Sequence, residues 1–518
     1  MTKGTVTGTG RALRGALAGL VAAAVALSVA ELVAAITGPL SSPVIAVGGT
    51  AIDLTPAPVK DFAVAHFGSD DKAALETGIL VLLAIFAAVI GTLAALWLAA
   101  GLAGLAVFGA IGVSAAVTRP AAGPAAALPA VIGVAVAATA LTVLIKAARG
   151  SRRENPAGAS EVARPDRRRF LAAAGMAAAA AVVAGGAGDL LLRRFSAAAA
   201  RSQVRLPRAA VQAPPTPVGA DLKIPGVSSF FTPDTSFYRV DTDLVVPQVS
   251  PEQWTLHITG MVDHEVELTF AELLKLPLIE HDMTLVCVSN EVGGPYAGNA
   301  RWLGASLPAL LRRAGMRRGA DQVLSASTDG MTISTPVATI MDGRQALIAV
   351  GMNGQPLPLE HGFPARMVVP GLYGYVSATK WVTRLEVTTF ARQRAYWTQR
   401  GYAAEAPIKT ESRIDVPRPL ARFPAGPVAV AGVAWAPHRG ISAVEVCVDG
   451  GPWHVARLAA ADGTDTWRQW TWAWNAAPGL HTLQVRATDG TGATQTPQRA
   501  GVLPNGATGR DSVVVTVT

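Results

Sequence analysis

The sequence predicts a multi-domain protein with three parts. We expect an N-terminal region of five transmembrane helices, an α+β domain, and a C-terminal all-β domain shaped as an immunoglobulin-like sandwich. Half of the 518 residues are hydrophobic and only 15% are charged, which is too apolar for one soluble globule. The long apolar runs are confined to the first 195 residues, and period-two strands dominate after residue 402.

The charge balance favours a membrane over a nucleic acid as partner. The formal net charge is +8, but the basic residues are not interleaved with aromatic ones. Many of them flank apolar runs, as in membrane proteins that follow the positive-inside rule. We therefore expect contact with membrane lipid and no nucleic-acid partner.

Five apolar runs are long enough to cross a bilayer, which needs about 20 residues. They cover about residues 12–36, 79–99, 102–118, 128–147 and 170–192. Residues 79–117 carry no charge and are too long for one span, so we expect a hairpin near Gly101 and Gly104. Residues 37–76 are predicted to be a polar loop. Glu31 is expected at the membrane interface or facing other helices.

A basic segment separates the fourth and fifth runs. From Lys146 to Arg169 it holds eight basic and three acidic residues, so we expect it in the cytoplasm. It ends in Arg167-Arg-Arg-Phe-Leu171, which resembles a twin-arginine export signal, although an ordinary stop-transfer flank is an alternative. With the N-terminus inside, the fifth span carries everything after residue 195 outward. This predicts a multi-pass protein of the cell membrane with an extracytoplasmic catalytic domain.

The rest of the chain divides by composition. Residues 196–225 are rich in Ala and Pro and are predicted to be a linker. Residues 226–402 mix short strands, turns and short helices, which is typical of an α+β domain. Residues 403–518 alternate with period two, and their tryptophans at 470, 472 and 474 share one face of a strand, which predicts the sandwich.

Two cysteines carry the first chemical signal. Thr284-Leu-Val-Cys-Val-Ser-Asn290 reads as a strand that delivers Cys287 to a glycine-rich loop. A thiolate suits a soft metal, but zinc or iron–sulfur binding would lack further ligands nearby. A cysteine nucleophile, a buried structural cysteine and a Cys287–Cys447 disulfide all remain open at this point. Cys447 lies on the opposite strand face from its valine neighbours, and we expect a structural, unpaired thiol there because Cys287 would be committed to a metal.

A second segment carries cations among glycines, prolines and aromatics. His361 and Arg366 lie in Leu357–Arg366, and Lys380 lies in Tyr373–Trp381. Close backbone approach and cationic side chains fit a flat ligand with a phosphate at one end.

Taken together, these motifs resemble the sulfite oxidase family of molybdopterin enzymes over roughly residues 226–518. The similar segments occur in the family's order: Phe237–Arg239, Thr284–Asn290, Ala300–Trp302, Met352–Pro358, His361–Arg366, Lys380–Trp381 and Ile408–Ile414. The resemblance implies a molybdenum–molybdopterin cofactor and oxygen-atom transfer at a molybdenum-oxo centre. It also implies that the last domain forms a homodimer.

The resemblance also assigns residues. Cys287 would be the molybdenum ligand and, with Arg239, a catalytic residue. The pterin and its phosphate would be held by Tyr238, Asn290, His361, Arg366, Ser377 and Lys380. The substrate would be a small oxo-acceptor or oxo-donor. No histidine falls in the predicted spans, so no haem is expected there and the electron-transfer partner would be a separate protein.

Two departures bear on the substrate. The family's animal and plant sulfite oxidases carry two arginines after Cys-x-x-Asn, where this chain has Glu291 and Val292. They also carry a catalytic tyrosine upstream of Met352, where Ser327–Ile333 contains none. Loss of a cation weakens binding of a dianion such as sulfite. A sulfoxide reductase of the same fold, or an inactive cell-surface binding protein, are therefore the alternatives.

Overall fold

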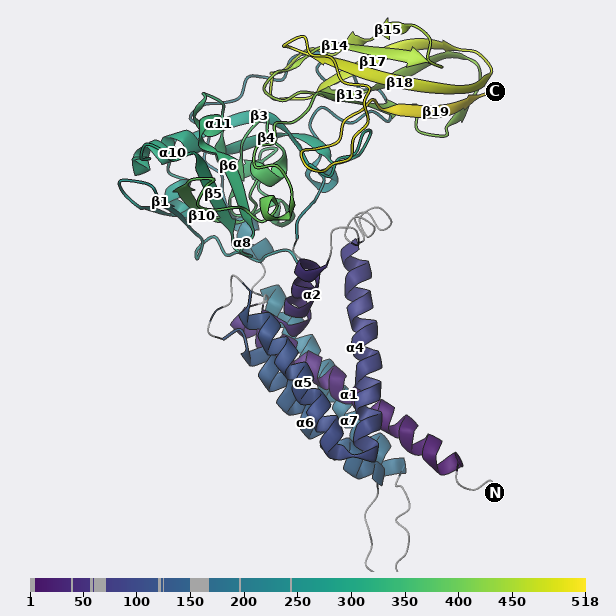
Figure 1. Ribbon diagram of the computed structural model, residues 1–518. Helices are drawn as coiled ribbons and strands as arrows, with labels where there is room; N and C mark the ends of the chain where they lie inside the picture. The colour runs from purple at the N-terminus through teal and green to yellow at the C-terminus, as the bar shows by residue number, and fades with distance from the viewer. Residues whose placement is uncertain are drawn as a thin grey trace, which may run out of the picture. The chain divides into compact units, whose positions relative to one another are not determined.

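The chain divides into two units in the computed structural model (Figure 1). The structure describes residues 5–38, 41–55, 59, 71–119, 123, 125–149, 167–194, 197–242 and 245–518. One unit comprises Met1–Ala199 with Thr242–Gln248, and the other comprises Ala200–Asp241 with Val249–Thr518. Most of the predicted basic segment between the fourth and fifth spans lies outside the described residues.

The first unit is built from helices. These are α1 (Thr5–Thr37), α2 (Pro43–Leu54), α4 (Asp71–Leu96), α5 (Leu98–Val117), α6 (Leu128–Arg149), α7 (Arg167–Arg194) and α8 (Ala197–Gln203). By length and composition, five stretches could cross a membrane: Gly10–Thr37, Leu75–Leu96, Leu98–Val117, Leu128–Arg149 and Arg168–Leu191. They correspond to the five predicted runs. The apolar helix α2 lies inside the stretch that was predicted to be a polar loop, so that part of the prediction was wrong.

The predicted pair of helices in the uncharged run is present, but the turn between them does not lie at Gly101 and Gly104. The helices break at Trp97, whose backbone is extended, and both glycines lie inside α5. A Cβ at Gly101 would collide with Ala94 of α4, and one at Gly104 would lie 3.0 Å from the Ile90 side chain. Because they lack a side chain, these glycines permit close packing of α5 on α4. Glycine is used for close packing in apolar helices as well as for tight turns.

Two arginines fix which helix ends lie together. Arg11 of α1 donates from Nε to the Ala95 carbonyl at 2.9 Å, and Arg149 of α6 donates to the same carbonyl at 3.2 Å. The last carbonyls of α4 have no partner within their own helix, so these cations satisfy them and oppose the helix dipole. The start of α1 and the ends of α4 and α6 therefore share one end of the unit. Glu31 accepts a hydrogen bond from the Ser42 hydroxyl.

The second unit contains four sheets. In the α+β part, the strands are β1 (Thr255–Gly260), β2 (Val266–Thr269), β3 (Leu278–Val286), β4 (Ala297–Ser306), β5 (Gln322–Ser327), β6 (Thr332–Pro336), β7 (Leu347–Met352), β8 (Gln355–Pro356), β9 (Arg366–Val368) and β10 (Val382–Thr388). One sheet has the order β2-β1-β10-β5-β6. The other has the order β3-β4-β7-β8, with β9 paired to β7. The short helices are α9 (Phe270–Leu273), α10 (Leu307–Ala314) and α11 (Val337–Met341).

The β-sheet part follows from residue 411. Its strands are β11 (Glu411–Val416), β12 (Arg422–Phe423), β13 (Gly426–Trp435), β14 (Ile441–Val448), β15 (Trp453–Val455), β16 (Arg457–Leu458), β17 (Arg468–Ala476), β18 (Gly479–Asp489) and β19 (Ser512–Val517). They form two sheets, β11-β13-β17-β16 and β12-β19-β18-β14-β15. Side chains from both sheets share one core, which includes Trp470 and Trp474, as the period-two pattern predicted.

The two parts of this unit pack against each other. The core of the α+β part includes Trp435 and Trp467 from the β-sheet part. The backbone N–H of Thr284 in β3 donates to the Asp465 carbonyl at 2.9 Å. Within the predicted linker, residues 196–225, the segment after α8 lies along the α+β part, where Val211 pairs with Ile279. The strand that leads to Cys287 is therefore held from two sides.

Candidate active site

Cys287 directly follows β3 and begins a tight loop. Its N–H donates to the Tyr296 carbonyl at 2.9 Å, and its carbonyl accepts from the Asn290 N–H at 3.0 Å. The side chain is 9% exposed, and its Sγ accepts from the Ser289 N–H at 3.4 Å. Burial raises the pKa of the Cys287 thiol, while the Ser289 hydrogen bond and the charge of Lys380 act in the opposite direction.

Both cysteines are free and buried, so the Cys287–Cys447 disulfide that the sequence left open is not formed. The Cys447 thiol donates to the Gly451 carbonyl at 3.4 Å in its own hairpin. The prediction of an unpaired Cys447 is confirmed, and the Cys287 sulfur remains available as a ligand.

An aromatic cluster lies beside the cysteine. Phe237 stacks on Tyr238 with ring centres 5.2 Å apart and meets the edges of Trp302 and His361 at 6.0 and 5.4 Å. A side chain at Gly298 in β4 would enter the Phe237 ring, so this glycine makes room for the cluster. Burial raises the pKa of Tyr238, and the charge of Cys287 raises it further, so Tyr238 and Cys287 lie near each other.

Arg366 supplies the positive charge beside this aromatic cluster, and His361 lies next to it. Arg366 is 6% exposed and lies over the Trp302 ring at 5.4 Å. Its Nη1 reaches the His361 carbonyl at 3.4 Å, but its Nε has no hydrogen-bond partner among the described residues. Burial lowers the pKa of Arg366 to about 10, so it stays charged at pH 7. Burial and the Arg366 charge lower the pKa of His361 to about 4, so this imidazole is neutral.

Lys380 and Arg239 share a carboxylate that sequence reasoning missed. Lys380 Nζ lies 2.7 Å from Asp241 Oδ2, and Arg239 Nε lies 2.8 Å from the same oxygen. Burial lowers the pKa of Lys380 to about 8, although Asp241 opposes the shift. The structure therefore brings Arg239 and Lys380 together, with Asp241 as the counter-ion. No local pattern marks Asp241, because its partner Lys380 lies 139 residues further along the chain.

Asn290 and Ser377 hold the loops. The Asn290 Oδ1 accepts from the Tyr296 N–H at 2.7 Å, whereas its buried Nδ2 is unpartnered within the described chain. The Ser377 hydroxyl donates to the carbonyls of Leu372 and Tyr373, both at 3.0 Å, and so shapes its own loop. Of the predicted cofactor-binding residues, Asn290 offers a spare donor, while the Ser377 donor is already used.

The β-sheet part supports the cysteine loop. Arg413 of β11 donates to the Gly294 carbonyl at 2.8 Å. Gly293 has φ +80°, and a side chain there would collide with the Asp511 carboxylate. Glu291, which replaces a family arginine, is exposed on this loop. The β-sheet part therefore holds the backbone of the cysteine loop.

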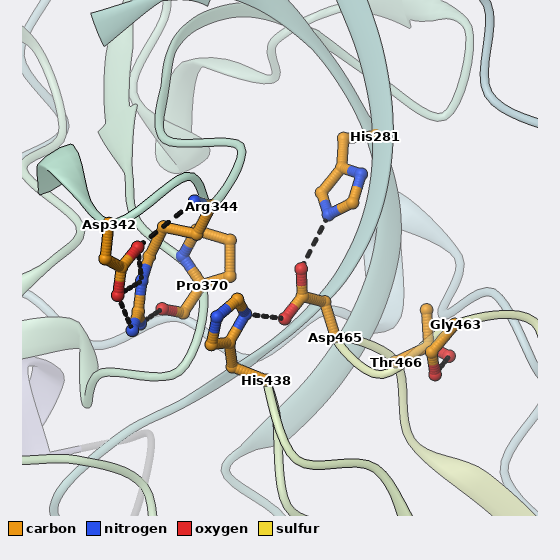
Figure 2. A network of polar contacts seen from close by, with 8 residues as sticks. All are labelled: His281, Asp342, Arg344, Pro370, His438, Gly463, Asp465 and Thr466. Atoms are coloured by element: carbon orange, nitrogen blue, oxygen red, sulfur yellow. Dashed lines mark hydrogen bonds and ion pairs between the residues drawn. The ribbon is translucent and has the colours of Figure 1, made fainter. Parts of the chain in front are cut away.

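A polar network joins the same two parts nearby. Figure 2 shows Asp465, which accepts from His281 Nε2 at 2.8 Å and from His438 Nδ1 at 3.1 Å. Hydrogen bonds to both histidines outweigh burial and lower the pKa of Asp465, so it is charged at neutral pH. In the same view, Arg344 donates to the Pro370 carbonyl at 2.5 Å. The Asp465 bond to His281 thus links β3 to the β-sheet part, and Arg344 holds the Pro370 segment within the α+β part.

The donors around Cys287 fit the group that the motifs imply. A pterin phosphate needs cations and N–H donors, and this pocket offers charged Arg366 and Lys380. The unpaired Arg366 Nε and Asn290 Nδ2 matter most, because buried donors in proteins are nearly always satisfied. Gly362, with φ +106°, lets the backbone pass close to Lys380. One sulfur ligand and several anion-binding donors fit a metal that is bound as part of a pterin cofactor.

The comparisons with known proteins agree with this geometry. Residues 243–397 match the family model described as oxidoreductase molybdopterin binding domain. The chain is 31% identical over 291 residues to human mitochondrial sulfite oxidase, covering 48% of this chain and 52% of that protein. It is 31% identical over 168 residues to the uncharacterized oxidoreductase YuiH of Bacillus subtilis, covering 32% of this chain and 81% of that protein.

A solved structure is also similar. The sulfane dehydrogenase SoxCD from Paracoccus pantotrophus matches with a TM-score of 0.49 and 24% identity, covering 57% of this chain and 88% of that one. The chain spans about half the length of the human sulfite oxidase that it matches, at 52%.

The α+β part, with its buried cations beside a single thiol, defines a molybdopterin-binding oxidoreductase. The chain belongs to the sulfite oxidase family of these enzymes.

Proposed function

We propose that this protein is a membrane-anchored, extracytoplasmic oxidoreductase that transfers an oxygen atom at a molybdenum cofactor held by Cys287. The observation that carries the proposal is the buried Nε of Arg366, which has no hydrogen-bond partner among the described residues and lies near a buried thiol. When bound, the molybdenum–molybdopterin group supplies two-electron oxygen-atom transfer and then passes electrons on singly.

The chain's own residues bind and orient that group. Cys287 supplies one sulfur, and because burial raises its pKa, metal binding must displace the thiol proton. Arg366 and Lys380 bind the phosphate, and the neutral His361 and Asn290 hydrogen-bond the pterin. Tyr238 and Phe237 wall the pocket and limit its access to water.

Arg239 is the cation we assign to the substrate. Its side chain is 34% exposed, so it is reachable from solvent, and Asp241 fixes its direction. Glu291 and Val292 occupy the positions where sulfite oxidases carry arginines, so one cation would meet the substrate. Sulfite is the first substrate to test, because the similar human protein carries that name.

The membrane arrangement is part of the proposal. Arg11 and Arg149 lie at one end of the helical unit, and a positive-inside bias puts that end in the cytoplasm. The fifth span would then lead outward, and Arg167–Leu171 would act as the twin-arginine signal. The β-sheet part would adopt an immunoglobulin-like fold and form the homodimer, and the electron acceptor would be a separate protein.

Metal analysis and a dye-linked assay test the function. The full chain is purified in detergent from cells that make molybdopterin and from cells that cannot. We expect about one molybdenum and one pterin per chain in the first preparation only, and sulfite-dependent reduction of a dye. Absence of molybdenum and pterin from the first preparation would overturn the proposal. Alkaline-phosphatase fusions test the topology: we expect activity after residue 200 and none at residue 155.

A further inference from the structure

Glu411 is a buried acid that the proposed site does not use. It is the first residue of β11 and is 4% exposed. Its Oε1 has no hydrogen-bond partner within the described part of the chain. Burial raises the pKa of Glu411 to about 8, with Asn290 and Lys409 acting against the shift. At neutral pH this side chain is therefore mostly a carboxylic acid.

Two unpaired donors come from elements that pack around this acid. The Asn290 Nδ2 of the cysteine loop is buried without a partner among described residues, and so is the Trp435 Nε1 of β13. Glu411 and Trp435 are opposite one another in the β11–β13 register, so their side chains share a face. The Asn290 amide is near enough to lower the pKa of Glu411, although the two side chains do not meet hydrogen-bond geometry in this structure. Both N–H donors therefore lie near a Glu411 carboxyl oxygen that can accept a hydrogen bond.

Glu411 is also close enough to Tyr373, in the segment beside Cys287, for its charge to affect the Tyr373 phenol. The charges of Glu411 and Cys287 both raise the pKa of Tyr373, after burial, so this phenol lies near both groups. Tyr373 is 1% exposed, and its N–H donates to the Ala406 carbonyl at 2.9 Å. The Cys287 loop, the Tyr373 segment and β11 therefore meet at one buried place.

Lys409 does not neutralise Glu411 by direct pairing. Its Nζ donates to the Gly506 carbonyl at 2.5 Å and to Asn505 Oδ1 at 3.1 Å. The charged or titratable groups that interact with Glu411 are then Lys409, two residues before β11, and Tyr373. A direct ion pair would favour the ionised carboxylate, whereas Glu411 is mostly protonated at neutral pH. An ion pair therefore does not explain why this acid is buried, and a role in hydrogen bonding has to be considered.

We propose that Glu411 is a positioning residue for the metal site: it accepts one hydrogen bond from Asn290 Nδ2, whose second N–H remains for the pterin, and so fixes the loop that carries Cys287. The Asn290 N–H already bonds the Cys287 carbonyl at 3.0 Å, so holding Asn290 holds the cysteine backbone. The inference rests on the proposed function. It makes the β-sheet part a contributor to the geometry of the metal.

Two substitutions separate positioning from simple packing. Glu411→Gln keeps the shape and the acceptor but cannot ionise, and Glu411→Leu removes the acceptor. The exposed Glu405→Gln is the matched control. Each full-length protein is purified from molybdopterin-producing cells. For each protein we measure the molybdenum and pterin content, the electron paramagnetic resonance spectrum of the partly reduced metal, and dye-linked turnover from pH 6 to 9.5.

We expect Glu411→Gln to keep its metal content, spectrum and pH 7 turnover within about twofold of wild type. We expect wild-type turnover to fall above about pH 8, where Glu411 ionises and places a buried charge beside Asn290, and we expect Glu411→Gln to lose this fall. Glu411→Leu should keep the metal but show a shifted spectrum and at least tenfold lower turnover. Rescue by Gln is a result that packing alone does not produce, because Leu is similar in size.

The inference is wrong if Glu411→Leu matches wild type in spectrum and turnover, or if Glu411→Gln keeps the wild-type alkaline fall. Should Glu411→Leu fail to fold, the pH profile and spectrum of Glu411→Gln decide alone. If the wild-type protein contains molybdenum and is active, and the Glu411 variants behave like it, only this inference is overturned. A wild-type protein without molybdenum overturns the proposed function and this inference with it.

Discussion

Replacing Lys380 with methionine should stabilise the cofactor-free protein and destroy its ability to keep the cofactor. The Lys380 side chain is 10% exposed, and burial lowers its pKa from 10.5 to about 8 despite Asp241 at 2.7 Å. The difference corresponds to roughly 3 kcal/mol at ~1.36 kcal/mol per pH unit. Methionine has a similar length and no charge, and Arg239 remains to pair Asp241.

The pH dependence gives this prediction its sign. Because the folded-state pKa of Lys380 is below the unfolded value, the unfolded chain binds the proton more tightly. The penalty for burying the charged lysine is absent above about pH 10.5, grows as the pH falls, and is complete below about pH 8. Lys380→Met should therefore gain up to ~3 kcal/mol at pH 7, about 5 °C in melting temperature, and little at pH 10.5.

The assay uses two preparations of the same variant. Thermal unfolding, followed by tryptophan fluorescence, is measured on protein from cells that lack molybdopterin. Pterin and molybdenum are measured on protein from cells that make it, where we expect less than a tenth of the wild-type content. The exposed Lys275→Met is the control and should change neither quantity. A variant that is less stable at pH 7 and keeps its pterin would refute the reasoning, because Lys380 would then be a structural partner of Asp241.

Three further predictions follow from the described contacts. Cys287→Ser should lower dye-linked turnover more than a hundredfold while the circular dichroism spectrum stays unchanged; full turnover would contradict the ligand assignment. Asp465→Asn should lower the free energy of unfolding in urea by about 2–4 kcal/mol at pH 7, because the single amide oxygen cannot replace the two carboxylate oxygens that bond His281 and His438. The difference from wild type should shrink below about pH 3.8, as the pH approaches the lowered pKa of Asp465. Gly19→Leu should reduce the yield of folded protein in detergent, because its Cβ would collide with the Ala87 carbonyl, whereas Gly10→Leu, with nothing within 4 Å, should not.

The features that sequence predicted well are those with local signals. The five apolar runs are recognised by length alone, and Cys287 by its place after an apolar strand. The glycines at 101 and 104 were misread, because glycine permits both a tight turn and a close helix contact. Only the neighbouring helix, with Ala94 and Ile90, decides between these uses.

The residues that sequence reasoning missed depend on distant partners. Asp241 pairs with Lys380 across 139 residues, and Asp465 pairs with His281 across 184. A lone acidic residue is usually solvated, so neither stands out in the sequence. What makes them notable is burial next to a specific cation or imidazole, and burial is a property of the folded chain.

The β-sheet part is best understood as part of the active-site architecture. Its Trp435 and Trp467 belong to the core of the α+β part, and Arg413 holds the carbonyl of Gly294 in the cysteine loop. Removing this part would expose that core and leave the loop without its Arg413 contact, so the sequence boundary near residue 403 does not separate two independent folding units. Substitutions in β11 can therefore alter the metal site although β11 lies more than a hundred residues after the cysteine.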